Sequence, residues 1–200
     1  MTATTMEPNP ALADLSGCDR HGVKGKGAAS WLNSIGVELP LRPNRLIERE
    51  DGLIVARYGE TEFAFADFRD EPSGAVDALR RALERDRPDG CFSVPRRDGQ
   101  AAFGLTGGAV MGGLSAVCPA DLRPGAFGPG DVLQTLCAGV SAQLWNLSRG
   151  DATRVVVICD SSVARHQWAA LHMAMAAAGR RARPGGFRVD DPNPAQRRMS

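Results

Sequence analysis

The stretch from Gly104 to Gly113, GLTGGAVMGG, is the part of the sequence closest in appearance to a phosphate-binding loop. It lies between an expected strand and an expected helix, where backbone N–H groups can meet a phosphate. The glycines are not spaced as G-x-G-x-x-G, however, and the G-K-[ST] ending of a P-loop is missing. Asp121 follows too soon to be the acidic partner of a ribose. We therefore expect these glycines to serve close packing rather than nucleotide binding.

Carboxylates gather at two expected strand-to-helix junctions. Asp67, Asp70 and Glu71 precede one expected helix, and Asp160 precedes Ser161 at the start of another. Carboxylates at such junctions typically interact with the positive end of the following helix. The third acidic candidate is Asp121, which we expect to form a local ion pair with Arg123. The sequence thus predicts no catalytic residue.

The histidines and cysteines do not form a metal-binding pattern. His166 and His172 lie six positions apart on an expected helix, about 240° around its axis, and His21 lies in an expected loop. No CxxC spacing is present, and the odd number of cysteines argues against a disulfide framework. We expect buried free thiols and no metal site; the cysteines are Cys18, Cys91, Cys118, Cys137 and Cys159.

Composition and charge are those of an ordinary globular chain. The apolar fraction is 43%, the charged fraction is 24% and the formal net charge is +1. No global field therefore favours nucleic acid or an anionic membrane as a partner. The longest apolar runs fall short of the roughly 20 residues that span a bilayer. The first residues, MTATTMEPNPALADLSG, lack the pattern of a secretory signal, so we expect a cytoplasmic protein.

A glycine turn, a helix and a closing Arg-Pro occur twice in the chain. The segment GVKGKGAASWLNSIGVELPLRP begins at Gly22, and its later counterpart begins at Gly104. Gly25 and Gly107 are separated by the same 82 positions, as are Leu32 and Leu114. We interpret this as an internal repeat.

The same order of elements follows each copy. In the first half, a hairpin is predicted at residues 53–58 and 62–68, followed by a helix. In the second half, a hairpin is predicted at residues 132–138 and 141–147, followed by a strand and by a helix that stops at Gly179. Further strands are expected at 91–94 and 101–105, leading into the second half. The pattern predicts an α+β fold of two pseudo-symmetric halves, each with helices on an antiparallel sheet. We divide the chain into a flexible N-terminus (1–20), a first half (21–88), a second half (89–179) and a flexible Arg/Pro-rich tail (180–200).

Both helices that follow the glycine turns carry an apolar stripe at i, i+3, i+4 and i+7. We expect them to pack near the pseudo-twofold axis, because glycines permit close approach. Trp31 and Leu32 in the first copy, and Leu114 and Val117 in the second, should then be buried.

The second copy and its continuation, GLTGGAVMGGLSAVCPADLRPGAFGPGDVLQTLCAGVSAQLW, resemble the gamma subunit of heterotetrameric sarcosine oxidase. The positions that carry the resemblance are Cys118, Pro119, Asp121, Leu122, Pro124, Phe127, Gly130, Gln134 and Thr135. The similarity covers roughly residues 20 to 178. It implies the two-half fold of the folate-binding aminomethyltransferases, including the glycine-cleavage T-protein.

The resemblance also implies a function and a set of partners. The chain would be a structural, cofactor-free subunit beside alpha, beta and delta subunits. The complex would use FAD, FMN, NAD and tetrahydrofolate to demethylate sarcosine oxidatively. Relatives in methylglutamate dehydrogenase look alike, so the amine stays open. A stand-alone folate-binding or aminomethyltransferase-like protein is the alternative function.

A subunit should present apolar surface to its partners. Leu46, Ile47 and Phe127 lie among turn formers in the irregular segments after each Arg-Pro. We name these three as candidate partner contacts; the alternative is that they fold back and seal the core of their own half.

Overall fold

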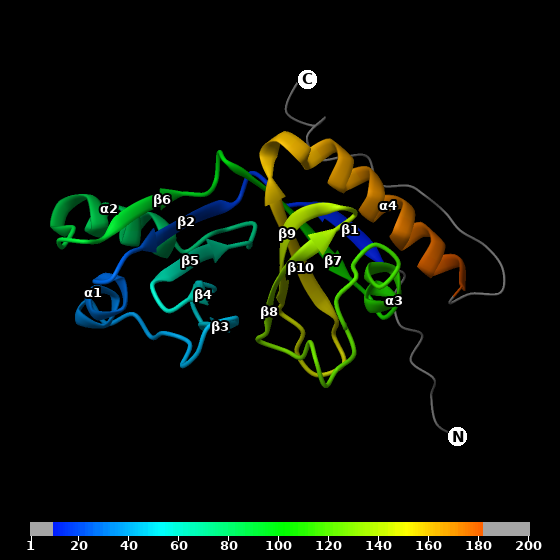
Figure 1. The fold of residues 1–200 in the computed structure, drawn as a ribbon, viewed down its shortest axis with the longest axis horizontal. Helices are drawn as coiled ribbons and strands as arrows, with labels where there is room; N and C mark the ends of the chain where they lie inside the picture. Colours follow the sequence, from blue (N-terminus) through cyan, green and yellow to red (C-terminus); the bar gives the residue numbers. More distant parts are fainter. Residues whose placement is uncertain (1–9, 182–200) are drawn as a thin grey trace.

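The computed structural model describes residues 10–181, with side chains to residue 179, as two five-stranded antiparallel sheets packed face to face (Figure 1). Helices cover the outer face of each sheet, which gives four layers in the order helix, sheet, sheet, helix. The α+β class with two pseudo-symmetric halves is therefore confirmed.

The first sheet has the strand order β3-β4-β5-β2-β6 and the second has the order β8-β9-β10-β7-β1. The first comprises β3 (Arg45–Glu48), β4 (Ile54–Gly59), β5 (Glu62–Asp67), β2 (Asp19–Lys24) and β6 (Phe92–Pro95), with helices α1 (Ala28–Ser34) and α2 (Ala75–Asp86). The second comprises β8 (Val132–Cys137), β9 (Val140–Asn146), β10 (Arg154–Asp160), β7 (Gln100–Thr106) and β1 (Ala11–Asp14), with helices α3 (Val110–Leu114) and α4 (Ala164–Arg181). A 3₁₀ turn, η1 (Ser161–Val163), leads into α4.

The two halves exchange their first strands. β1 directly precedes β2 along the chain, yet it pairs with β7 of the second sheet, with Ala11 opposite Thr106. β6 directly precedes β7, yet it pairs with β2 of the first sheet, with His21 opposite Pro95. The structural repeat is therefore β-β-α-β-β-β-α, with the first strand of each copy placed on the sheet of the other.

This exchange changes several expectations from the sequence. Residues 11–14 form a strand rather than part of a flexible N-terminus, and β6 belongs to the first sheet rather than the second half. His21 lies on β2, not in a loop, and residues 45–48 form a strand instead of an irregular segment. Residues 1–9 and 182–200 of the predicted flexible ends lie outside the described residues, and α4 continues past Gly179.

Period-two alternation along the strands divides the core into three parts. On β5, Phe63 and Phe65 face the helices, whereas Ala64 and Ala66 face the other sheet. Small side chains allow the two sheets to approach, and Trp145 of β9 fills the centre of this interface. The indole N–H of Trp145 donates to the hydroxyl of Tyr58 at 3.2 Å, which links the two sheets.

The position expected for the two short helices is wrong. α1 packs on the outer face of the first sheet and α3 on the outer face of the second, so the two helices lie in opposite outer layers. Trp31, Leu32 and Leu114 are buried as expected, but Val117 is only partly buried. The apolar stripe predicted burial correctly, but it could not specify which of the two faces of a sheet the helix would cover.

Candidate functional site

The glycines of the repeat are explained by the strand exchange. A Cβ atom on Gly22 would lie 2.6 Å from Arg96 Nε, and one on Gly104 would lie 2.9 Å from Leu15 Cδ1. Arg96 directly follows β6 and Leu15 directly follows β1. Each glycine therefore leaves room for the side chain that comes after an exchanged strand. These contacts account for the first glycine of each copy without a phosphate.

The later glycines shape the turns and the helix packing. Gly25 and Gly107 both adopt positive φ angles, 123° and 110°, at the entrances to α1 and α3. A Cβ atom on Gly113 would lie 2.3 Å from Met175 Cε, so this glycine lets α3 pack against α4. Gly112 has no heavy atom within 4 Å of its built Cβ position and serves no such contact. With only five residues, α3 offers no extended helix N-terminus to an anion.

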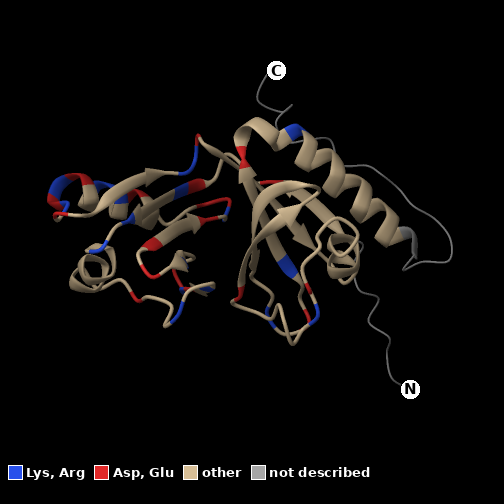
Figure 2. Cartoon of the chain, in the orientation of Figure 1, with Lys and Arg blue, Asp and Glu red and all other residues tan. Residues whose placement is uncertain are grey.

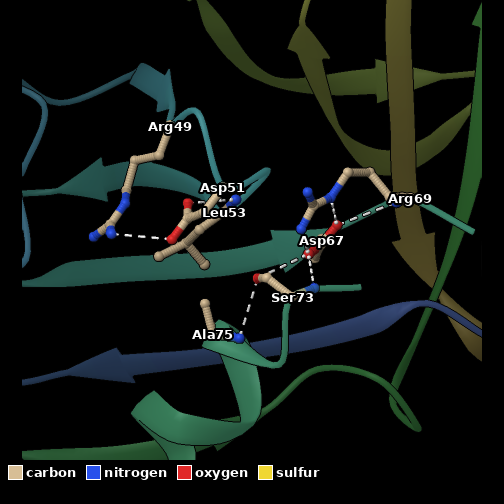
Figure 3. Close-up of polar contacts among 7 residues, drawn as sticks. All are labelled: Arg49, Asp51, Leu53, Asp67, Arg69, Ser73 and Ala75. Carbon is tan, nitrogen blue, oxygen red and sulfur yellow. Dashed lines mark hydrogen bonds and ion pairs between the residues drawn. The ribbon is translucent and has the colours of Figure 1, made fainter. Parts of the chain in front are cut away.

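The buried carboxylate of Asp67 holds the junction between β5 and α2 (Figure 3). It accepts hydrogen bonds from Arg69 Nε at 2.9 Å and Nη2 at 2.6 Å, and from the backbone N–H of Ser73 at 2.9 Å. Burial opposes ionisation, but the hydrogen bonds from Arg69 and Ser73 outweigh it and lower the pKa of Asp67 to about 2. This network is structural and holds the loop between β5 and α2; its donors Arg69 and Ser73 precede α2, so Asp67 does not bond to the helix itself as expected.

The other two acidic candidates also have local partners. Asp160, at the equivalent end of β10, accepts a hydrogen bond from the backbone N–H of Ser162 at 2.8 Å. Asp121 forms the expected ion pair with Arg123, at 2.6 Å, on the exposed surface. The hydrogen bonds from Arg123 lower the pKa of Asp121 to about 2.

A cavity of about 510 Å³ lies between α2 and the strands β2 and β6. A hydrogen bond of 2.9 Å joins His21 Nε2 to Ser93 Oγ at its wall. Burial, assisted by the charge of Arg80, lowers the pKa of His21, so the imidazole is neutral at pH 7. No pattern in the sequence indicates this pair, because the two residues meet only when β6 joins the first sheet.

Most of the charged residues around the cavity have ion-pair or hydrogen-bond partners. Arg97 contacts Asp19 at 3.0 Å, and Arg80 contacts Glu84 at 2.7 Å. Arg20 is buried and donates five hydrogen bonds to the backbone carbonyls of residues 15, 16, 18, 97 and 100, where the two exchanged chains cross. Arg20 therefore holds the crossover, whereas Arg80 is paired within α2.

The cavity does not suit a folate. A pterin ring needs aromatic and carboxylate groups around it; carboxylates line this cavity, but apart from the imidazole of His21 it has no aromatic lining, since no Phe, Tyr or Trp lines it. Tyr58 and Trp145 instead pack edge-on against each other between the sheets, with ring centroids 6.2 Å apart. The cavity can hydrogen-bond a small polar molecule through His21 and Ser93.

Of the three candidate partner contacts, Leu46 and Phe127 are buried inside the chain and Ile47 is partly buried. Leu46 is buried between the two sheets, and its N–H donates to Gly130 O at 2.8 Å, which joins β3 to the segment before β8. Phe127 is 1% exposed in the core between the second sheet and its helices, and Ile47 packs at the edge of the first core. They seal the chain's own core, the alternative that the sequence left open.

The exposed apolar side chains lie elsewhere. In the described part of the chain, the large apolar side chains that are exposed are Ile35, Leu41, Phe92, Leu136 and Met173. Met173 on α4 is 71% exposed and Leu41 in the loop after α1 is 99% exposed. Met173 was not singled out from the sequence, although the helical period indicates its exposure: it lies two positions, about 200° around the axis, from the buried Leu171 and Met175.

The cysteines are free thiols, and four of the five are buried, as expected. Burial raises the pKa of Cys137 and of Cys159 to about 11. Within residues 10–179, no group of three or more His, Cys, Asp or Glu side chains is placed to hold a metal ion. None of the helices that the structure describes combines the length and hydropathy needed to cross a membrane.

No protein-family model matches the chain, and no curated protein matches its sequence. Its fold is similar to that of two solved structures. The glycine cleavage system aminomethyltransferase T from Bartonella henselae matches with a TM-score of 0.55 and 15% identity, over 82% of this chain and 45% of that chain. The heterotetrameric sarcosine oxidase from Corynebacterium sp. U-96, solved in complex with pyrrole 2-carboxylate, matches with a TM-score of 0.70 and 23% identity, over 85% of both chains.

The chain therefore has an aminomethyltransferase-like α+β fold. It spans less than half the length of the aminomethyltransferase it matches, but most of the length of a chain in the sarcosine oxidase. The resemblance to sarcosine oxidase seen in the sequence is thus confirmed at the level of the fold.

Proposed function

We propose that this chain is the gamma-type structural subunit of a heterotetrameric sarcosine oxidase-type complex. The observation that carries the proposal is the fold match over 85% of both this chain and a chain of a heterotetrameric sarcosine oxidase. The lengths therefore agree as well as the folds, which distinguishes this match from the partial match to the aminomethyltransferase.

In this proposal the chain contributes contacts, while the redox chemistry belongs to the alpha, beta and delta subunits. FAD, FMN, NAD and tetrahydrofolate would be bound by those subunits in a cytoplasmic complex that demethylates sarcosine oxidatively and transfers a one-carbon unit to tetrahydrofolate. The paired charges around the α2 cavity and the aromatic residues enclosed between the sheets are consistent with a subunit that holds none of these groups itself.

The alternative is a stand-alone folate-binding or aminomethyltransferase-like protein of the same fold, which the match to the aminomethyltransferase favours. The alternative requires a folate site within this chain. No Phe, Tyr or Trp lines the cavity between α2, β2 and β6, which weighs against that cavity as the site.

Purification of the tagged full-length chain from its own host tests the proposal. We expect it to co-purify in stoichiometric amounts with flavin-containing subunits, and the complex to consume oxygen with sarcosine or a related N-methyl amine. Calorimetric titration of the isolated chain with tetrahydrofolate tests the alternative. A chain that purifies alone and binds tetrahydrofolate saturably at micromolar concentration would contradict the subunit proposal.

A further inference from the structure

The outer helical layer of the second half carries no charged residue over long stretches. No Lys, Arg, Asp or Glu occurs between Asp98 and Asp121, a segment that contains β7 and α3. None occurs between Arg165 and Arg180, which covers nearly all of α4. The two helices pack against each other through Gly113 and Met175, so the two uncharged stretches form one continuous layer. We call the exposed side of this layer the α3/α4 face.

The equivalent layer of the first half is different. α2 and α4 occupy equivalent positions in the two halves. α2 follows β5 and α4 follows β10, and each helix covers the outer face of its sheet. Half of the twelve residues of α2 are charged, and they pair along the helix, as between Arg80 and Glu84 or Arg81 and Asp77. Figure 2 shows this contrast: α2 is largely red and blue, whereas α4 is tan along most of its length and α3 is tan throughout.

The α3/α4 face is exposed and is not needed by the core of this chain. The inward residues of α4, Leu171 and Met175, already pack on the second sheet. On the outward side, Met173 is 71% exposed, and its neighbours are small or uncharged. The other exposed members of the face are Gly112, Ser115, Ala116, Ala169 and His172.

Two features of this face match the centre of a protein interface rather than a solvated helix, namely the lack of Lys, Arg, Asp and Glu and the exposed methionine. A surface helix normally presents charged or polar residues on the side that faces water. The centres of interfaces are depleted of charged residues and enriched in Met, and small residues allow another backbone to approach closely. The uncharged stretch of α4, residues 166–179, has 14 residues and so provides a face about 21 Å long.

We propose that the α3/α4 face docks onto an uncharged, apolar surface of a large flavin-containing subunit of the complex. The inference rests on the proposed function and identifies the surface through which that function operates. Charge complementarity determines the kind of partner surface, because an opposing charge buried against this face would find no partner there and would be strongly unfavourable. Met173 is the anchor, and the small residues around it let the partner approach the helix.

Two substitutions of the same chemical type test the proposal in the full-length chain, co-expressed with the large subunits. Met173→Glu introduces a carboxylate on the α3/α4 face, and Leu41→Glu introduces one in a loop of the first half, where Leu41 is 99% exposed. Both side chains are exposed, so both isolated variants should melt at the temperature of the wild type. We expect Met173→Glu to weaken binding of the large subunits at least about tenfold and Leu41→Glu to leave it unchanged.

Hydrogen exchange supplies a second measurement that needs no substitution. In the assembled complex, exchange of the amides of α3 and α4 should slow relative to the isolated chain, and exchange of α2 should not. Protection of α2 instead, or tight binding by Met173→Glu, would overturn the docking surface.

The remaining outcomes distinguish the two proposals. A wild-type chain that never associates with flavin-containing subunits overturns both. Wild-type binding that both variants retain overturns only the α3/α4 face. If the isolated chain forms a homodimer and Met173→Glu dissociates it, the α3/α4 face binds a second copy of the chain. If α4 is protected from exchange and deletion of residues 183–200 removes that protection, the face binds the chain's own C-terminus. Either result overturns the choice of partner.

Discussion

The replacement of Asp67 by Asn tests whether one buried carboxylate sets the acid sensitivity of the first half. The Asp67 side chain is 1% exposed and accepts hydrogen bonds from both the side chain of Arg69 and the backbone of Ser73. Asparagine keeps the shape but loses the charge, and its NH₂ group would point at one of these donors. We expect Asp67→Asn to lower the free energy of unfolding at pH 7 by about 2 to 3 kcal/mol.

The pH dependence gives a second magnitude. A fall in the pKa of Asp67 from 3.8 to about 2 corresponds to about 2 kcal/mol of stabilisation. Because the folded-state pKa is depressed, this stabilisation is complete above pH 3.8 and is lost as the pH falls toward 2. Wild-type stability should therefore drop by this amount below pH 4, and the Asp67→Asn variant should lack this part of the decline.

Urea unfolding followed by tryptophan fluorescence, at several pH values between 7 and 2, measures both effects. Asp121→Asn is the matched control, because Asp121 has a similar bidentate arginine partner and a pKa of about 2 but lies on the exposed surface. We expect no measurable loss of stability from Asp121→Asn. Equal stability losses in the two variants, or an unchanged acid profile in Asp67→Asn, would refute the argument.

Four further substitutions test the packing. Gly112→Ala should stabilise the chain by about 0.5 to 1 kcal/mol in thermal unfolding, because the added Cβ has open space within α3. Gly113→Ala should destabilise the chain, because its Cβ would collide with Met175. The same sign for both variants would contradict the close approach of α3 and α4. Arg20→Met should cost about 3 kcal/mol or more in urea unfolding, because buried carbonyls at the strand crossover lose their donor; a near-neutral result would show that water replaces the guanidinium. Phe127→Ala should cost about 3 to 5 kcal/mol in the isolated chain, and unchanged melting would return Phe127 to the partner surface.

Local patterns in the sequence were sufficient for most of the regular elements. The apolar stripe of residues 75–86 and the alternation around Gly59 predicted α2 and the β4–β5 hairpin, since both signals arise from residues close together in the chain. The 82-residue spacing of the glycine turns predicted two related halves, and the sheet orders confirm this symmetry. The carboxylate of Asp160 was assigned correctly, because its donor Ser162 lies two residues away at the start of η1, whereas the donors to Asp67 precede α2.

The arrangement of the halves depended on contacts between residues far apart in the chain. The four residues of β1 have too little alternation to indicate a strand, and their pairing with β7 comes from positions about 90 residues away. That exchange and the packing of one sheet on the other have three consequences. They bury Leu46 and Phe127, bring His21 to Ser93, and separate α1 from α3. The sequence by itself determined which residues are apolar and which segments are regular; the tertiary structure decided which apolar residues face the core and which, like Met173, face outward, because burial depends on the partner that each face meets.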